Sequence, residues 1–239
     1  MEENVKQILT QLHGAVATYK MPEIAQQIVG SGQVTILCGV TASGKNTIAN
    51  YLVEHGNYEH VVSHTTRAPR ENHGILEQNG VEYWFVTPAQ MLGLVQQQAF
   101  IEVKAIHGET CYGTSIPSVQ KVISTGKHPV MEIDVQGALE LTEVVHNLRP
   151  LFILPPSYDV WMQRLGSRGF LSDGERERRL RSGTMEIQTA LDHPAFILTV
   201  NHEVELTAAE IMSGVDPSQQ TQDEYRALAL ELLDTIRNI

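Results

Sequence analysis

The stretch Gly39–Thr47, which reads GVTASGKNT, has the residue types and spacing of a phosphate-binding loop. The apolar run before it, Val34–Cys38, predicts a buried strand of a parallel sheet, and Ile48–Val53 after it predicts the first turns of a helix. Glycines let successive backbone N–H groups point at an anion, and the helix N-terminus adds partial positive charge. Lys45 supplies a full charge for the outer phosphates. The stretch therefore predicts a phosphate site on an α/β fold.

Composition predicts a packed chain and argues against nucleic-acid or membrane partners. Of 239 residues, 42% are hydrophobic, which suits one large domain with a smaller subdomain. The net charge of -11 argues against nucleic-acid binding. No apolar run reaches the length of a membrane span, and the acidic N-terminus lacks a secretory signal pattern. The two cysteines, Cys38 and Cys111, have no partners at metal-ligand spacing, which predicts reduced thiols and a cytoplasmic location.

Most arginines of this acidic chain gather in two segments, which indicates a polyanionic ligand. One segment holds Arg67 and Arg70, and the other holds Arg164, Arg168, Arg176, Arg178, Arg179 and Arg181. The alternative is a solvated helix face with salt bridges to Asp173, Glu175 and Glu177. That alternative accounts well for Arg176, Arg178 and Arg181. It accounts poorly for Arg67 and Arg70, because no helical pattern surrounds them.

Four further apolar runs predict the rest of the core sheet. They are His60–Ser63, a strand that begins at Pro129, Leu151–Leu154 and Phe196–Val200. The strand from Pro129 ends in the acids Glu132 and Asp134, beside the predicted phosphate loop, where magnesium is commonly held. Alternatively, Glu132 caps the strand or pairs with an arginine.

Shorter elements between the second and third core strands predict an inserted β subdomain. Val81–Val86 and Phe100–Ile106 alternate as strands do. A helix between them should run from Pro88 to about Gln98, with Thr87 as its N-cap. Residues 71–80 are expected to form a flexible hairpin tip.

Both ends extend beyond this plan. Residues 1–30 predict two helices separated near Pro22, which we expect to pack outside the main domain. A linker at Gly214–Gln222, rich in Ser and Gln, precedes a final helix over Asp223–Ile236. The sequence indicates no role for either extension.

The order of these motifs resembles the guanylate kinase family, which are P-loop nucleoside monophosphate kinases. The resemblance covers about residues 33–212. The matching segments are Gly39–Thr47, Ser63–Arg70, Gly80–Tyr83, Phe100–Glu102, Tyr112–Thr114, Ile133–Gly137, Pro155–Ser157, Arg164–Gly169 and Val200–Asn201. Each match is weak alone, but their order and spacing together are specific.

The resemblance implies a P-loop NTPase fold, with a parallel core sheet flanked by helices, an inserted mixed β subdomain for GMP and an arginine-rich helical lid. The implied division is an extension at 1–32, a kinase-like domain at 33–212 and a tail at 213–239. Within the domain, the core is 33–63 and 117–212, the GMP-binding subdomain about 64–116 and the lid about 164–190.

The resemblance also implies the site residues. ATP would be bound by Gly39, Thr41, Ala42, Ser43, Gly44, Lys45, Asn46, Thr47 and Asn201. The GMP phosphate would be held by Ser63, Arg67, Arg70, Tyr83 and Tyr112, and the guanine base by Glu102, Thr114 and Asp134. The catalytic residues would be Lys45, Arg67, Arg164, Arg168 and Arg179. Carboxylates suit the N–H donors of guanine and a threonine hydroxyl suits its O6, whereas adenine would leave the carboxylates unpaired.

The implied reaction is transfer of the γ-phosphoryl group of ATP to GMP with Mg²⁺, in purine nucleotide metabolism. Two departures from the family pattern concern the metal: Asn46 lacks the usual hydroxyl, and Glu132 replaces the first aspartate of an Asp-x-Asp pair. Both remain candidate metal ligands, directly or through water. These two departures leave open a catalytically weak or inactive module that binds GMP or a protein. Separately, the loop between Arg70 and Gly80, which is longer than usual for the family, could admit dGMP or another base as acceptor. The sequence is equally compatible with a monomer and a homodimer.

Overall fold

The computed structural model describes residues 2–31, 34–72, 74–106, 110–145, 148–167 and 172–238. It divides the chain into two compact units, which are described separately. Unit 1 comprises residues 1–34, 60–129 and 144–146, and unit 2 comprises residues 35–59, 130–143 and 147–239. The chain thus enters and leaves each unit more than once.

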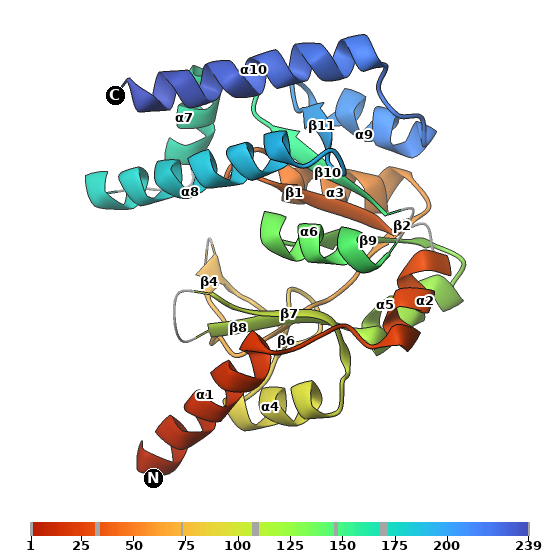
Figure 1. Cartoon of the computed structure of the whole chain (residues 1–239), viewed down its shortest axis with the longest axis vertical. Coiled ribbons are helices and arrows are strands. Elements are labelled where there is room, and N and C mark those ends of the chain that lie inside the picture. The colour runs from red at the N-terminus through yellow and green to blue at the C-terminus, as the bar shows by residue number, and fades with distance from the viewer. Residues whose placement is uncertain are drawn as a thin grey trace. The chain divides into compact units, whose positions relative to one another are not determined.

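Unit 2 is organised by a five-stranded sheet with the order β11-β10-β1-β9-β2 (Figure 1). The central strand β1 (Thr35–Gly39) is parallel to both neighbours, β10 (Arg149–Leu154) and β9 (His128–Glu132). The outer strand β11 (Ile197–Val200) is parallel to β10, and β2 (Tyr58–His60) forms the other edge. The expected α/β fold with a parallel core sheet is confirmed.

Helices of unit 2 bury the apolar faces of this sheet. The helix after the phosphate loop, α3 (Lys45–His55), packs against β1 and α9 (Val204–Ser213). Their shared core includes Leu37, Leu52 and Ala208, all with no exposed surface. The arginine-rich helix α8 (Asp173–Asp192) packs against β1 and α10 (Gln219–Arg237), which also covers β11. The remaining helices of the unit are α6 (Val135–Val144) and α7 (Tyr158–Gly166).

Unit 1 contains a separate four-stranded mixed sheet with the order β6-β3-β8-β7. The strands are β3 (His64–Thr65), β6 (Trp84–Phe85), β7 (Phe100–Ile106) and β8 (Thr110–Ser115). The β3–β6 pair is parallel, whereas β8 is antiparallel to β3 and β7. A small hairpin of β4 (Glu71–Asn72) and β5 (Ile75–Leu76) stands apart from this sheet.

The N-terminal segment is built into unit 1. Helix α1 (Glu2–Ala17) lies along α4 (Pro88–Gln96) and against β7 (Figure 1). Helix α2 (Glu23–Ser31) contacts β7 and α5 (Ile116–Ser124). The α1–α4 core includes fully buried side chains from Leu12, Met91 and Phe100. The N-terminal segment therefore contributes to the core of unit 1. The sequence alone predicts only that it packs outside the main domain.

Several local predictions are confirmed and others are corrected. Thr87 caps α4, since its side chain accepts a hydrogen bond from the Gln90 N–H and the Gln90 side chain bonds back. The second core strand is Tyr58–His60 rather than His60–Ser63, because the backbone carbonyl of Ser63 accepts a hydrogen bond from the Trp84 N–H of unit 1 at 2.8 Å instead of continuing the core sheet. Within the expected strand Val81–Val86, only Trp84 and Phe85 form one.

The C-terminal part also differs from expectation. Helix α9 was not predicted, and α10 begins at Gln219, inside the expected linker. Its start is fixed by Ser218, whose side chain accepts a hydrogen bond from the Thr221 N–H. Among the described residues, no helix is long and apolar enough to span a membrane.

Gly39 gives a test of the close approach between β1 and β10. Its φ is 134°, and an added Cβ would overlap the Ile153 carbonyl of β10. We expect Gly39→Ala to lower the free energy of unfolding by about 2 kcal/mol or more, measured by urea denaturation.

Gly14 offers the matched control. It lies inside α1, and nothing lies within 4 Å of its added Cβ. Gly14→Ala should raise stability by up to about 1 kcal/mol through helix propensity. Equal unfolding curves for Gly39→Ala and the unmodified protein would contradict the described packing.

Candidate active site

The loop between β1 and α3 has the backbone geometry of an anion-binding turn. Ala42 and Gly44 have φ values of 66° and 102°, in the left-handed region. Within the loop the Ser43 N–H donates to the Val40 carbonyl at 3.1 Å. Alternation of left- and right-handed residues turns successive N–H groups to one side, which creates a concavity for an anion. The loop leads directly into α3, whose N-terminus reinforces this positive potential.

The Lys45 ammonium lies within this loop. Its Nζ donates to the carbonyls of Gly39 at 2.5 Å and Val40 at 3.0 Å. Across from it, Glu186 of α8 accepts a hydrogen bond from the Ser182 hydroxyl at 2.9 Å. Burial raises the pKa of Glu186, and the nearby Lys45 partly opposes that rise. Sequence reasoning missed Glu186. The available signal was a carboxylate next to Ile187 and Ala190, on the side of α8 that is buried.

Three side chains donate hydrogen bonds to backbone carbonyls of the loop or next to it. Trp161 Nε1 of α7 donates to the Thr41 carbonyl at 2.8 Å, and Asn201 Nδ2 donates to the Ser43 carbonyl at 2.8 Å. Arg164 Nη2 donates to the Asn201 carbonyl at 3.0 Å, and its Nη1 donates to the Ser43 carbonyl at 3.4 Å. Burial lowers the pKa of Arg164. These bonds tie the loop to α7 and to the end of β11.

Two buried polar atoms beside the loop have no hydrogen-bond partner within the described ranges. They are Ser43 Oγ and Asn201 Oδ1, in residues that are 0% and 1% exposed. Buried polar atoms are normally hydrogen-bonded, so each marks a place where a ligand or a water molecule can supply a partner. Both belong to the predicted ATP-binding set.

Most arginines of α8 form salt bridges with acidic residues of the same helix, as the alternative of a solvated helix face predicted. Arg176 lies 3.6 Å from Asp173, Arg181 lies 2.7 Å from Glu177, and Arg178 pairs with Glu175. Arg179 also pairs with Glu175, through its Nε at 2.8 Å. Arg168, a predicted lid residue, lies outside the described residues.

Three predicted base-reading and phosphate-binding residues meet in unit 1. Glu102 of β7 lies opposite Thr114 of β8, and its Oε1 accepts hydrogen bonds from the Thr114 N–H at 2.9 Å and hydroxyl at 2.7 Å. The Ser63 hydroxyl lies 3.1 Å from the same Thr114 hydroxyl. Glu102 is 8% exposed and Thr114 is fully buried. The carboxylate is therefore fixed in direction by two donors.

A cationic and aromatic group lies on the same face of β8. Tyr112 is two residues from Thr114, so both side chains share a face. The Arg67 guanidinium lies 5.3 Å from the centroid of the Tyr83 ring, and that ring lies 5.8 Å from the ring of Tyr112. A guanidinium beside two phenols can bind a phosphate through charge and hydrogen bonds. The structure thus brings these three predicted residues together.

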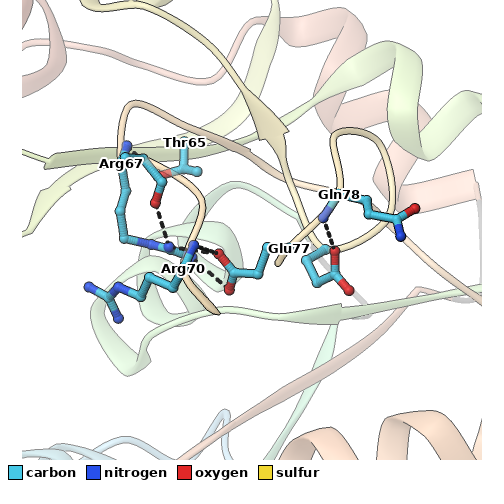
Figure 2. A network of polar contacts seen from close by, with 7 residues as sticks. Thr65, Arg67, Arg70, Glu77 and Gln78 are labelled. Atoms are coloured by element: carbon cyan, nitrogen blue, oxygen red, sulfur yellow. Dashed lines mark hydrogen bonds and ion pairs between the residues drawn. The ribbon is translucent and has the colours of Figure 1, made fainter. Parts of the chain in front are cut away.

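Glu77 connects Arg67 to Arg70 (Figure 2). Its carboxylate accepts from Arg67 Nη1 at 2.8 Å and Nη2 at 3.1 Å, and from the Arg70 N–H at 2.8 Å. The Glu77 N–H donates back to the Arg70 carbonyl at 2.9 Å. The side chains of Arg67 and Glu77 are only 10% and 9% exposed. Glu77 thus fixes both the Arg67 guanidinium and the backbone of Arg70.

This pairing shifts both charges toward their ionised forms. The hydrogen bond from Arg67 lowers the pKa of Glu77. Burial alone would lower the pKa of Arg67, but its hydrogen bonds to Glu77 and Tyr112 raise the pKa overall. Sequence reasoning missed Glu77, because the segment 71–80 predicts a flexible hairpin tip and nothing in it indicates an arginine partner. No sequence signal distinguished Glu77 from Glu71 and Glu82, which also lie between Arg70 and Tyr83.

The two remaining acids belong to unit 2, with the loop residues rather than with Glu102 and Thr114. Asp134 is exposed, and its Oδ1 accepts a hydrogen bond from the Gly137 N–H at 2.9 Å at the start of α6. Glu132 ends β9, opposite Leu37 of β1. Among the described residues, no three His, Cys, Asp or Glu side chains gather as a metal site.

Comparisons with known proteins agree with this geometry. A family model described as guanylate kinase matches residues 31–216. A protein called guanylate kinase from Neisseria gonorrhoeae is 32% identical over 204 residues, which cover 85% of this chain and 96% of that protein. One from Leifsonia xyli subsp. xyli is 34% identical over 184 residues, covering 75% and 68%. The crystal structure of guanylate kinase from Anaplasma phagocytophilum has a TM-score of 0.58 at 28% identity, covering 76% of this chain and 83% of that one.

Removing the charge of Glu77 should destabilise unit 1. Glu77→Gln leaves the buried Arg67 guanidinium without its anion, so we expect a loss of about 1–3 kcal/mol at pH 7 in urea denaturation. Glu82→Gln is the matched control, since Glu82 accepts from the Gln78 N–H in the same segment and is exposed. It should change stability by no more than about 0.5 kcal/mol.

The same variant predicts a pH dependence. Because the pKa of Glu77 is lowered in the folded state, its contribution is complete above the ordinary value of 4.5 and is lost as pH falls below it. The stability difference between Glu77→Gln and the unmodified protein should therefore shrink at acid pH. A difference that stays constant down to strongly acid pH would rule out a charge-based role.

Proposed function

The chain belongs to the guanylate kinase family, and we propose that it transfers the γ-phosphoryl group of ATP to GMP, giving ADP and GDP. One observation carries the proposal furthest. The mixed sheet of unit 1 places a fixed carboxylate, Glu102, and a guanidinium, Arg67, on a face that can read a base and bind a phosphate. Unit 2 carries the complementary phosphate loop with Lys45.

ATP binding is supported by the loop and its lysine. The Lys45 ammonium donates to the neutral carbonyls of Gly39 and Val40, and phosphate oxygens are stronger, charged acceptors. Exchange of these partners would place the ammonium on the outer phosphates. The adenine would lie toward Asn201, whose Oδ1 is buried and needs a donor.

GMP binding is supported by the two groups on the sheet of unit 1. The N1–H and exocyclic amine of guanine would donate hydrogen bonds to Glu102. Asp134 is proposed as a second acceptor because it belongs to a segment, Ile133–Gly137, that matches the family motif. Thr114 already donates its hydroxyl to Glu102, so the carboxylate is oriented before the base arrives. The phosphate would take hydrogen bonds from Arg67, Arg70, Tyr83, Tyr112 and Ser63.

The chemical problem is electrostatic. The acceptor is already an oxyanion, so the reaction needs no general base, but two polyanions must approach in line. Lys45 and the arginines would stabilise the charge that spreads over the transferring phosphoryl group. We assign this charge stabilisation to Arg67, Arg164, Arg168 and Arg179. Closure around the nucleotides would exclude water that otherwise hydrolyses ATP.

The residues present are compatible with Mg²⁺. Asn46 and Thr47 occupy the first turn of α3, and Glu132 ends the strand beside β1, which leads into the loop. Mg²⁺ usually takes one or two protein ligands and completes its shell with water and phosphate oxygens, so a cluster of three acids is not required. When bound, the ion would neutralise part of the phosphate charge. Asn46 and Glu132 are the proposed ligands, directly or through water.

We also propose a cytoplasmic location and no nucleic-acid partner. Cys38 and Cys111 are buried free thiols, as suits a reducing compartment. Burial raises the pKa of Cys111 to about 11, so its thiol remains protonated. The net charge of -11 would repel nucleic acid.

An acceptor panel tests the proposal directly. ADP release from ATP and Mg²⁺ is coupled to an indicator reaction, with GMP, dGMP, AMP, UMP or CMP as acceptor. We expect strong turnover with GMP and little with the other bases. Lys45→Met should lower kcat by at least about 100-fold through loss of transition-state charge stabilisation.

Lys121→Met is the matched control, because Lys121 is exposed on α5 of unit 1 and belongs to none of the proposed nucleotide-binding sets. It should leave the turnover unchanged. Full activity of Lys45→Met would refute the mechanism. Turnover with another monophosphate would keep the mechanism and refute the guanine assignment, whereas GMP binding without turnover would favour a binding module.

A further inference from the structure

We propose that Tyr19, in the N-terminal segment, is a positioning residue for the acceptor nucleotide, because it anchors the start of β7 and so directs the carboxylate of Glu102. The inference rests on the proposed function, in which Glu102 reads the base. Tyr19 lies before residue 31, where the family match begins. The segment would then give this chain a device for acceptor recognition outside the shared family region.

One hydroxyl bonds both backbone groups of one buried residue. Tyr19 Oη donates to the Phe100 carbonyl at 2.6 Å and accepts from the Phe100 N–H at 3.0 Å. Phe100 has no exposed surface, and β7 lies at the edge of the sheet, beside β8. A buried N–H and C=O at an edge need partners that the ladder cannot provide. Tyr19 therefore takes the place of a neighbouring strand at this point.

The anchored residue begins a β-bulge that ends at Glu102. Phe100 pairs with Ser115, and Glu102 pairs with the next residue back, Thr114, so Ile101 is the extra residue. A bulge loosens the ladder and re-aims the side chains beside it. The direction of Glu102 thus depends on what fixes the two ends of the bulge. Thr114 fixes one end through two hydrogen bonds, and Tyr19 fixes the other.

Tyr19 is itself held in place by the packing of α1. The Tyr19 N–H donates to the Val16 carbonyl at 3.2 Å, at the end of that helix. Val16 and Leu12 pack in the same core as the Phe100 side chain, with Tyr19 against them. Burial raises the pKa of the Tyr19 hydroxyl, the bond to Phe100 opposes this, and the charge of Glu102 raises it again. The hydroxyl thus stays protonated and remains a donor at neutral pH.

Tyr19→Phe tests the inference, since it removes one oxygen and keeps the ring in its core. We expect the KM for GMP to rise about 5- to 20-fold, with kcat within about twofold and the KM for ATP unchanged, as for loss of one or two buried hydrogen bonds. Tyr58→Phe is the matched control. Tyr58 is a buried tyrosine, whereas Tyr19 is half-buried, and the Tyr58 hydroxyl bonds Thr35 in unit 2. It should leave the KM for GMP unchanged.

Hydrogen exchange supplies a readout that does not need the reaction. In Tyr19→Phe, amides of the peptide 99–106 and of Thr114 should exchange faster, while peptides of β1 and β10 keep their rates. Unchanged exchange at 99–106, or an equal rise in the KM for ATP and GMP, would overturn the inference. If the unmodified protein neither binds nor phosphorylates GMP, the proposed function fails, and the exchange rates still decide whether Tyr19 fixes the bulge.

Discussion

A loop that turns its N–H groups toward an anion must turn its carbonyls into the protein, where each needs a donor. That constraint organises unit 2. The carbonyls of Thr41 and Ser43 are met by Trp161 and Asn201, which come from α7 and from the end of β11. An added Cβ on Gly183 of α8 would lie 2.7 Å from the Trp161 ring, so α8 must approach closely to cover it. The loop thus dictates how later elements pack.

Unit 1 must stabilise a positive charge in a largely buried position. Arg67 is satisfied by Glu77 on its two terminal nitrogens and by the rings of Tyr83 and Phe85 on its faces. Its Nε is buried and has no partner within the described ranges. The guanidinium is therefore held in one orientation, with donor capacity remaining, which lowers the entropic cost of binding an anion.

The sequence was most informative where one local pattern determined the outcome. The order of strand, loop and helix around Gly39–Thr47, the strand Phe100–Ile106 and the cap at Thr87 depend on neighbours only a few residues away, and all three are confirmed. Glu77 and Tyr19 were not found, because their partners lie 10 and 81 residues along the chain and no periodicity encodes such contacts. Strand β2 was misplaced because the apolar pair Val61–Val62 looks the same whether the chain continues a sheet or leaves it.

The discontinuous course of the chain has a consequence during synthesis. Unit 1 ends by residue 146, whereas unit 2 cannot complete its sheet until β11 at Ile197–Val200 has emerged from the ribosome. Domains tend to fold as units during synthesis. Unit 1 can therefore fold first, whereas β1 cannot pair with its neighbour β10 until β10 has been synthesised. The apolar β1 and α3, synthesised early and paired late, are then the segments most in need of a chaperone.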